Sequence, residues 1–325
     1  MSEPSAQVPP VASVGSGAST VPARRFARPA LSTLGLSPGK RTRLKHLLYD
    51  HGPGGGTLLI LPIDQGLEHG PIDFFDNPDS LDPKYQYDLA RDGRFSAIAL
   101  HIGLAEKYFH EYAGDVPLIL KINGKTAIPS DAQAFSALTG SVEDAVRLGA
   151  DAVGYTVYVG SPSQDRDFAQ FSQVREDADR FGMPLIVWAY PRGEAVAKKG
   201  GRDGLYAIDY AARVALELGA DIVKVNYPVA SAKDAEAPPP YNTLHLSPDE
   251  AFRKVVESAG RALVLVSGGE KVGDDQLLTK VRSSLDAGAT GVIFGRNLWQ
   301  RHRDEALRVT RELHAIFREY AQPSA

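Results

Sequence analysis

One lysine stands inside an apolar run of the sequence, the segment ADIVKVNY from Ala220 to Tyr227. Its neighbours Ile222, Val223 and Val225 are β-branched residues that suit a buried strand. Burial disfavours an ammonium group, so it would lower the pKa of Lys224 and leave a neutral amine able to attack a carbonyl carbon. The run therefore predicts a Schiff-base lysine at Lys224. The alternative is a lysine near a strand end whose amine reaches solvent or a carboxylate.

Two glycine-containing segments further along the chain have the composition of an anion site. The first is Ser267, Gly268 and Gly269, and the second is Gly295 with Arg296. Glycines let backbone N–H groups approach a phosphate closely, and a guanidinium can bond to it at two points. Either segment alone could be an ordinary tight turn. Together they predict a phosphate-binding site.

The elements that must position these residues alternate between apolar strands and amphipathic helices from about residue 41 onward. We predict eight strands, at Leu58–Ile63, Phe95–His101, Leu118–Lys121, Ala152–Val157, Leu185–Tyr190, Asp221–Val225, Ala262–Val266 and Gly291–Phe294. Strands that are apolar on both faces and alternate with helices are typical of a parallel α/β sheet. Eight such units predict a (β/α)8 TIM barrel. An open doubly wound sheet is the alternative, but no GxGxxG turn follows any strand.

Residues typical of helix ends support this alternation of strands and helices. A short helix over Arg41–Leu48 is predicted before the first strand. A capping box at Ser141 with Asp144 marks the start of a second helix, and Pro248 stands at the first position of a third. We predict further helices at Gln164–Phe181, Asp203–Leu218, Asp274–Ala287 and His302–Tyr320.

Residues 1–40, rich in Ser, Pro, Ala and Gly, are expected to be a disordered or loosely packed extension of the domain at 41–325. An irregular segment, Val229–Leu246, follows the Lys224 strand and is expected over the mouth of the barrel, as a plain surface loop or near the site.

The carboxyl ends of barrel strands meet in one mouth, which gathers further candidates there. They are Asp64 and His69 after the first strand, Lys125 after the third, and Trp188, Tyr190 and Arg192 at the fifth. We assign proton transfer to Tyr190, on the expectation that a nearby cation lowers its pKa. Asp64 would orient Lys224 or accept a substrate hydroxyl, and Trp188 would shape the pocket. A core tyrosine and a turn-capping aspartate remain the alternatives.

Composition narrows the class of protein. The 325 residues carry a net charge of −4, with 43% hydrophobic and 23% charged residues. This composition indicates a soluble globular protein and offers no basic stripe for nucleic acid and no apolar run for a membrane. The absence of cysteine excludes disulfides and thiol catalysis and agrees with a cytoplasmic location. His69 with Asp64 and Glu68 is the one conceivable metal nucleus, and we predict no metal there.

Taken together, the motifs resemble those of the archaeal-type class I fructose-bisphosphate aldolases, the DhnA family. The matching blocks lie between Leu59 and Arg301 and include IDQGLEHGPIDFFDNPDS, LILKINGKT, AVGYTVYVGS, VWAYPRG, ALELGADIVKVNY, SGG and GRNLWQR. The resemblance implies a TIM barrel, no cofactor, a homo-oligomer, and metal-independent cleavage of fructose 1,6-bisphosphate to dihydroxyacetone phosphate and glyceraldehyde 3-phosphate in glycolysis or gluconeogenesis.

The resemblance also implies roles for individual residues. Lys224 would form the Schiff base, Tyr190 would be the acid/base with Trp188 beside it, and Asp64 would be the first-strand aspartate. The blocks at Ser267, Gly268, Gly269, Gly295 and Arg296 would bind the phosphate next to the ketone. Lys125 and Arg192 are our candidates for the far phosphate.

The chain departs from the family pattern in its leader, its AEAPPP insertion, and Asn226, where the family often has a second lysine. Two other functions therefore remain open. One is a related Schiff-base aldolase or transaldolase-like synthase acting on another sugar phosphate. The other is a phosphosugar-binding barrel without catalysis.

Overall fold

Eight parallel strands close into a barrel in the computed structural model, which describes residues 27–323. The strands are β1 (Leu58–Pro62), β2 (Ala97–His101), β3 (Leu118–Lys121), β6 (Ala152–Val159), β7 (Leu185–Pro191), β8 (Ile222–Val225), β9 (Leu263–Ser267) and β10 (Gly291–Ile293). The first strand pairs with both β2 and β10, which closes the sheet and excludes the open alternative. The predicted TIM barrel and its eight strands are confirmed, with shifts of one or two residues at half of the strand ends.

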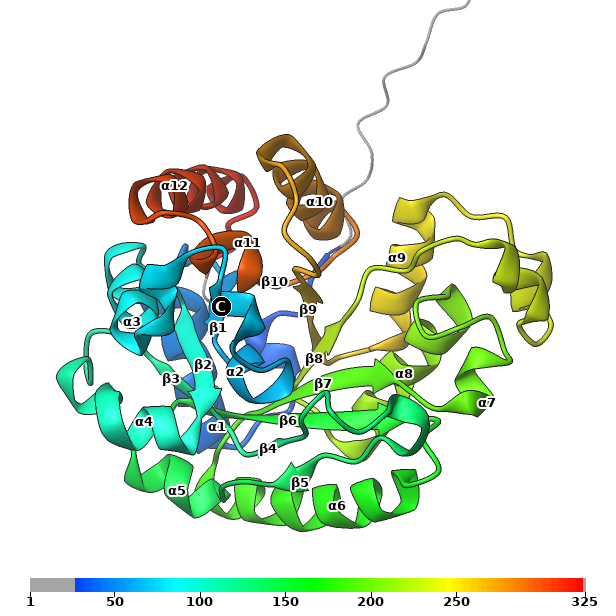
Figure 1. Cartoon of the computed structure of the whole chain (residues 1–325), viewed down its shortest axis with the longest axis horizontal. Coiled ribbons are helices and arrows are strands. Elements are labelled where there is room, and N and C mark those ends of the chain that lie inside the picture. Colours follow the sequence, from blue (N-terminus) through cyan, green and yellow to red (C-terminus); the bar gives the residue numbers. More distant parts are fainter. Residues whose placement is uncertain (1–26, 324–325) are drawn as a thin grey trace, which may run out of the picture.

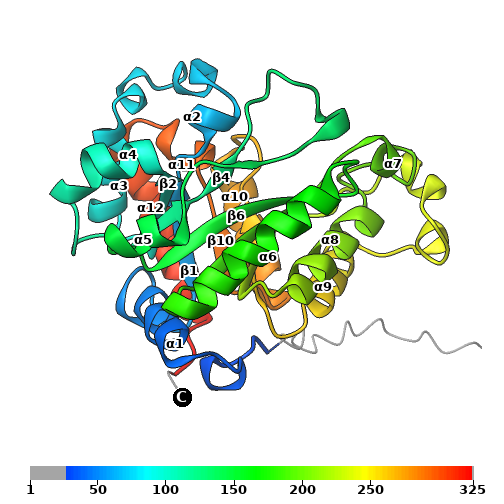
Figure 2. The same ribbon diagram turned by 90° about the horizontal axis from the view of Figure 1, so that it is seen from below.

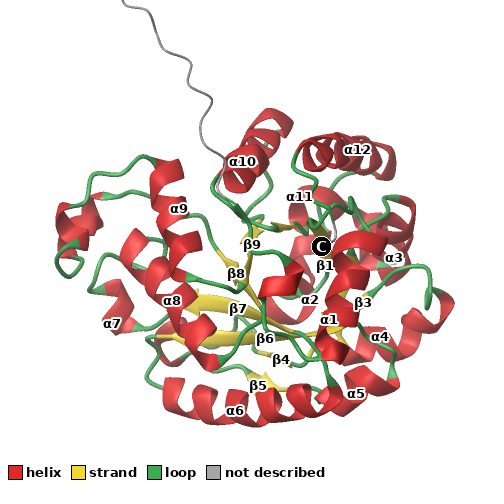
Figure 3. Ribbon diagram, turned by 180° about the vertical axis from the view of Figure 1, so that it is seen from behind, coloured by secondary structure: helices red, strands yellow, loops and turns green. Residues whose placement is uncertain are grey.

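Helices surround the barrel, so that the strands lie inside a ring of helices (Figures 1 and 3). The helices are α3 (Pro83–Asp92), α4 (Ile102–Tyr108), α5 (Val142–Arg147), α6 (Gln164–Phe181), α8 (Leu205–Leu218), α9 (Pro248–Ser258), α10 (Asp274–Asp286) and α12 (Arg303–Glu319). Shorter elements are α1 (Pro38–Lys45), α2 (Gln65–Glu68), α7 (Glu194–Ala197), α11 (Arg296–Trp299), and the hairpin strands β4 (Asn123–Gly124) and β5 (Ala137–Leu138). The hairpin and the short helices α2, α7 and α11 were not predicted.

Two hydrophobic layers follow from the alternation of side chains along each strand. Leu58 and Ile60 of β1 belong to a cluster inside the barrel, while Leu59 and Leu61 pack outward against the helices. Successive strand residues point to opposite faces, so both faces must be apolar. Ile222 of β8 lies in the inner cluster. The period of two therefore turns Lys224 inward as well.

The helix ends show the capping interactions expected from the sequence. The predicted capping box at Ser141 and Asp144 forms, and a second one forms at Ser247 and Glu250 ahead of α9. Such caps satisfy backbone N–H groups that the first helical turn leaves without acceptors. Gly219 ends α8 with a φ of +104°, a left-handed conformation that residues with a Cβ rarely adopt.

The amino-terminal segment closes the base of the barrel. Leu44 and Leu47 pack with Leu58 in the inner cluster, and Figure 2 shows α1 at the end of the barrel opposite to α2. The helix begins at Pro38, earlier than the predicted Arg41, and Leu31 before it is buried. The predicted flexibility of the leader falls largely on residues 1–26, which lie outside the described residues.

The segment 229–246 lies to the side of the barrel mouth, against α8 and α9 (Figure 1). Its Tyr241 hydroxyl donates to Asp209 Oδ2 at 2.6 Å, and Lys254 lies 3.0 Å from the same oxygen. Both partners belong to the outer helices, so the segment is anchored away from the strand ends. Within residues 27–323, no helix combines the length and the apolar character needed to cross a membrane.

The close packing of β10 against β1, which closes the barrel, can be tested at Gly291. A Cβ there would lie 1.9 Å from the Leu58 carbonyl oxygen, which belongs to the paired strand and cannot move independently. We expect Gly291→Ala to lower the free energy of unfolding by about 2 kcal/mol or more, measured by urea denaturation. Gly103→Ala is the matched control, because a Cβ at Gly103 meets nothing within 4 Å. Equal stability of the two variants would contradict the tight closure.

Candidate active site

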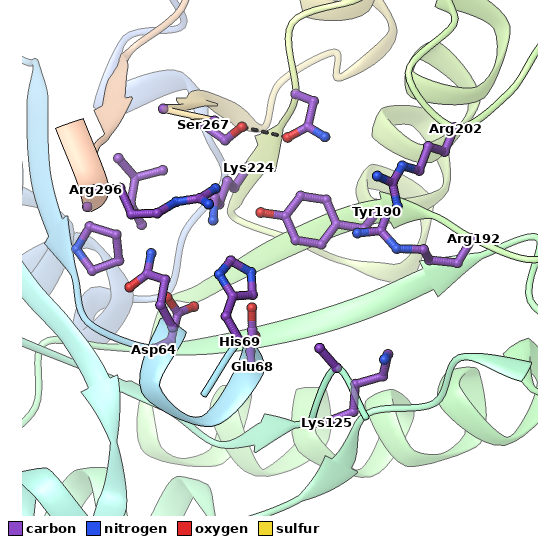
Figure 4. A pocket seen from close by; sticks show the side chains of 18 of the residues that line it. Asp64, Glu68, His69, Lys125, Tyr190, Arg192, Arg202, Lys224, Ser267 and Arg296 are labelled. Atoms are coloured by element: carbon purple, nitrogen blue, oxygen red, sulfur yellow. Dashed lines mark hydrogen bonds between the residues drawn. The ribbon is translucent and has the colours of Figure 1, made fainter. Parts of the chain in front are cut away.

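A cavity of about 320 Å³ opens at the carboxyl ends of the strands. Residues from β1, β7, β8, β9 and β10, or from the loops that follow them, contribute to its wall. Figure 4 shows the Lys224 side chain near its centre, with Arg296 and Ser267 to one side and Arg192 and Arg202 to the other. The strand ends thus bring together residues that lie more than a hundred positions apart in the chain.

Lys224 is 6% exposed, and its Nζ lies 4.9 Å from the ring centroid of Trp188 and 5.3 Å from that of Tyr190. Within residues 27–323 its amine has no hydrogen-bond or ion-pair partner. Desolvation lowers the pKa of Lys224, and the more distant carboxylates of Asp64 and Glu68 only partly oppose this. The predicted direction of the pKa shift is confirmed, and the amine is available as a nucleophile.

A second lysine, Lys121 of β3, is fully buried beside the first. Its Nζ lies 2.9 Å from Glu68 Oε1, 3.7 Å from Asp64 Oδ2 and 5.0 Å from the Trp188 ring centroid. Lys121 thus lies against two carboxylates, whereas Lys224 has none in contact. A Cβ at Gly154 would lie 2.7 Å from the Trp188 ring, so this glycine makes room for the indole beside the two lysines.

Asp64 is 1% exposed, and neither of its carboxylate oxygens accepts a hydrogen bond within the described part of the chain. Burial by itself would raise the pKa of Asp64. The charges of Lys121 and Lys224 outweigh burial and hold the pKa below its usual value. The result is an ionised carboxylate with two unused acceptor oxygens at the cavity wall, which can receive a substrate hydroxyl.

Tyr190 lies at the end of β7 and lines the cavity, as predicted, but its titration differs from our expectation. Burial, together with the charges of Glu68 and Asp64, raises the pKa of Tyr190, and this outweighs the opposite effect of Arg192 and Lys121. The expectation of a lowered pKa was wrong because it counted the cations and omitted burial and the carboxylates. Tyr190 is therefore a neutral phenol that can donate a proton.

One end of the cavity has the features of a phosphate site. The amides of Gly269 and Gly295 have no acceptor within residues 27–323, and the Arg296 side chain lies at the same end (Figure 4). The Gly268 amide differs from our expectation, since it donates to the Ile293 carbonyl at 3.2 Å. Gly268 instead provides space, because a Cβ there would lie 3.1 Å from Phe294.

Side chains outside the cavity hold this glycine loop in place. Asn297 Nδ2 donates to the carbonyls of Gly268 and Glu270, and the partly buried Lys280 side chain donates to the Ser267 carbonyl at 3.0 Å. Burial lowers the pKa of Lys280 to about 8. The Ser267 hydroxyl donates to Asn226 Oδ1 at 2.5 Å. Asn226, the residue that departs from the family pattern, thus ties β8 to the glycine loop.

Asp73 connects two predicted residues at the rim of the cavity. His69 Nδ1 lies 2.6 Å from Asp73 Oδ2, and Arg296 Nε lies 3.9 Å from the same oxygen. His69 is therefore engaged with this carboxylate, while Glu68 pairs with Lys121. Groups of three or more histidine, aspartate or glutamate side chains suited to a metal ion are absent from the described residues.

The opposite end of the cavity carries Lys125, Arg192 and Arg202, all within 3.5 Å of one carboxylate, that of Asp131. The guanidinium of Arg192 also lies 5.2 Å from the Tyr190 ring centroid, which connects this end to the centre. The site is therefore positively charged at both ends, with the lysine amine between them.

The cavity wall includes almost every predicted site residue. These are Asp64, His69, Lys125, Tyr190, Arg192, Lys224, Ser267, Gly268, Gly269, Gly295 and Arg296. Trp188 lies behind the two lysines rather than on the wall. The sequence analysis gave no role to Lys121, Glu68, Asp131 or Arg202. The segment GGRDG around Arg202 follows the fifth strand and was a usable signal, whereas nothing in the sequence pairs Asp131 with its three cations.

Comparison with known proteins places the chain among aldolases. Residues 58–301 match the DeoC/LacD family of aldolases. The class 1 fructose-bisphosphate aldolase of Thermoproteus tenax is 43% identical over 259 residues, 79% of this chain and 88% of the relative. An archaeal fructose-1,6-bisphosphate aldolase, solved with its catalytic lysine bound to the carbinolamine intermediate, is 40% identical with a TM-score of 0.71, covering 85% of this chain and 98% of that one.

A relative with a different activity is also similar. The 2-amino-3,7-dideoxy-D-threo-hept-6-ulosonate synthase of Halobacterium salinarum is 31% identical over 287 residues, 88% of this chain and 94% of its own length. The aldolase family predicted from the motifs is confirmed, while two substrate classes are represented among the relatives.

Burial of Lys224 predicts that its amine loses its proton at a lower pH than an ordinary lysine amine does. We expect its acylation by a limiting reagent, followed by peptide mass spectrometry, to reach half its maximum well below about pH 10.4, the ordinary lysine value. Lys84 is the control, since contact with Glu111 raises the pKa of its exposed amine. Because Asp64 opposes the lowering, Asp64→Asn should move the Lys224 midpoint further down. Coincident profiles for residues 224 and 84 would contradict this account.

Proposed function

The chain belongs to the DeoC/LacD family of aldolases, and we propose that it is a class I fructose-1,6-bisphosphate aldolase in which Lys224 forms the Schiff base. The observation that carries the proposal is a buried amine without a counterion in contact, at the centre of a cavity that is cationic at both ends. An open-chain ketose phosphorylated at both ends has the matching arrangement of charges, with its carbonyl near one phosphate.

The proposed reaction begins when the neutral Lys224 amine adds to C2 of the ketose. The carbinolamine hydroxyl leaves as water after taking a proton from Tyr190, the neutral phenol at the cavity wall. A cationic iminium results, and the ionised Asp64 lies close enough for its charge to act on the residue 224 nitrogen. Burial strengthens this interaction, since few water molecules screen it.

Carbon–carbon cleavage then follows from the iminium. The Tyr190 phenolate takes the proton of the C4 hydroxyl, the C3–C4 bond breaks, and its electron pair moves into the iminium to form an enamine. Glyceraldehyde 3-phosphate leaves. The enamine takes a proton at C3, and water releases dihydroxyacetone phosphate from the lysine. The raised pKa keeps the phenol protonated before the first step and makes its phenolate a strong base for the second.

The two ends of the cavity suggest how the substrate is oriented. We assign the phosphate next to the ketone to Gly269, Gly295 and Arg296, and the distal phosphate to the cations at the other end. Trp188 would shape the pocket from behind, and His69 would act at the rim through Asp73. A synthase acting on another sugar phosphate is the second candidate, since the same amine would serve it and one such enzyme is among the relatives.

Two further expectations belong to this proposal. We expect copies of the chain to associate, because Ile72, Phe75 and Leu81 expose large apolar surfaces on the segment after β1. We also expect a cytoplasmic location and a role in glycolysis or gluconeogenesis, since the sequence lacks cysteine and the proposed substrate is a sugar phosphate.

Reductive trapping tests the proposed function directly. Borohydride added with dihydroxyacetone phosphate should inactivate the enzyme and add to the peptide containing Lys224 the mass of one dihydroxyacetone phosphate less one oxygen atom, because water leaves and two hydrogens are added. Lys224→Met should abolish both the adduct and the cleavage of fructose 1,6-bisphosphate, because a thioether cannot add to a ketone. A chelator should leave cleavage unchanged, since the iminium accepts the electrons.

Lys121→Met is the matched control, because it removes the neighbouring buried lysine and leaves the amine at position 224 in place. Adduct on a residue other than 224, or full turnover in Lys224→Met, would overturn the proposal. Ligand binding without turnover in the unaltered protein would support a non-catalytic barrel. Cleavage confined to other sugar phosphates would favour the second candidate.

The role of Tyr190 gives a separate prediction. Tyr190→Phe removes only the hydroxyl, so kcat for fructose 1,6-bisphosphate should fall by about 10²- to 10⁴-fold, the usual contribution of general acid–base catalysis. Tyr158→Phe, a second tyrosine on the cavity wall, is the control and should retain most activity. A kcat within twofold of the unaltered enzyme in Tyr190→Phe would transfer the proton-transfer role to another group.

A further inference from the structure

One carboxylate, that of Asp131, lies among three cations at the far end of the cavity. Its Oδ1 lies 3.0 Å from Lys125 Nζ, and its Oδ2 lies 3.0 Å from Arg192 Nε and 3.5 Å from Arg202 Nη1. The three cations come from the loop after β3, from the end of β7, and from the loop ahead of α8. A single anion thus holds together side chains from three separate parts of the chain (Figure 4 shows the three cations).

Asp131 itself belongs to the cavity wall, and its side chain is 39% exposed, whereas those of Lys125 and Arg192 are 16% and 18% exposed. Lys125 and Arg192 are therefore more enclosed than the carboxylate, whereas Arg202, with 57% of its side chain exposed, lies on the solvent side. Burial would raise the pKa of Asp131, but Lys125 and Arg192 hold it below the usual value. The carboxylate stays ionised at neutral pH.

We propose that Asp131 occupies the position of the distal phosphate in the unliganded enzyme and is displaced by that phosphate when the bisphosphate binds. The inference rests on the proposed function and deepens it by naming a residue that governs selectivity. A phosphate dianion presents more charge and more acceptor oxygens than one carboxylate, and guanidinium groups bond to it at two points. It can therefore replace the Asp131 contacts, while an uncharged hydroxymethyl group cannot.

The segment that carries Asp131 has an exposed tip, and its following end is held by side chains of the barrel. Ile128 at the tip is 93% exposed, and Lys125 Nζ donates to the Thr126 and Pro129 carbonyls on either side of it. At the following end, Ser161 Oγ donates to the Ala134 carbonyl at 2.6 Å, and Asn123 Nδ2 donates to the Ser136 carbonyl at 3.3 Å. Displacement of Asp131 therefore requires rearrangement of a short exposed segment and leaves the barrel unchanged.

The proposal has a consequence for selectivity between substrates. Fructose 1,6-bisphosphate must displace the Asp131 carboxylate from the cations, whereas fructose 1-phosphate has no group to place there and leaves those contacts intact. The carboxylate thus competes with the distal phosphate and weakens apparent binding of the bisphosphate. Removal of its charge should favour the bisphosphate alone.

Steady-state kinetics of Asp131→Asn with both substrates tests the inference. The amide keeps the shape of the side chain and removes its charge. We expect KM for fructose 1,6-bisphosphate to fall about 3- to 10-fold, the effect of losing one partly exposed competing ion pair. Values of kcat, and KM for fructose 1-phosphate, should stay within twofold. Asp203→Asn is the matched control, because Asp203 also lies 3.5 Å from Arg202 but is absent from the cavity wall, and it should leave both substrates unaffected.

An unchanged or raised KM for the bisphosphate in Asp131→Asn would overturn the inference, because the carboxylate would then merely position the cations or have no role. Failure of the proposed function is visible separately, as an absence of cleavage of either substrate by the unaltered enzyme. In that case, titration calorimetry with inorganic phosphate still decides the matter. Tighter phosphate binding by Asp131→Asn than by the unaltered protein supports displacement, and equal or weaker binding contradicts it.

Discussion

Withdrawal of water from the amine of Lys224 is the constraint on which the rest of the site depends. An ammonium without a counterion is costly to bury, so the barrel interior favours the neutral form. The nearby carboxylates lie closer to Lys121, with Glu68 at 2.9 Å and Asp64 at 3.7 Å from its Nζ, and neither forms an ion pair with Lys224. Both lysine amines lie over the Trp188 ring, 5.0 Å and 4.9 Å from its centroid. One lysine thus lies against the acids, and the other is a buried amine with a lowered pKa.

The same low-polarity interior sets the character of the neighbouring groups. Tyr190 becomes a neutral proton donor because burial and nearby carboxylates oppose its ionisation. Burial and the Lys121 charge lower the pKa of His101 to about 4, so this histidine is uncharged near neutral pH. Asp64 alone among these acids and bases keeps a charge with unused acceptor oxygens. A parallel barrel can hold such a set because every strand delivers one polar residue to the same mouth and fills the layers below with apolar side chains.

Much of the fold and part of the site could be predicted from the sequence. Strands such as the one at Leu118–Lys121 were recognisable because both faces of a parallel strand are buried, which gives a continuous apolar run. Helix starts at Ser141 and Ser247 carried local capping signals. The two-residue strands β4 and β5 gave no comparable signal, since their pairing depends on the loop that they enclose.

Residue types and strand order by themselves determined that Lys224 would stand at the mouth of a barrel, because the period of two along a strand is a local property. They also determined the anion-binding composition near Ser267 and Arg296. Only the tertiary structure decided the protonation of Tyr190 and the cluster around Asp131, which spans Lys125 and Arg202. Ionisation and ion pairing depend on distance and burial in space, and the sequence sets these quantities only through the complete fold.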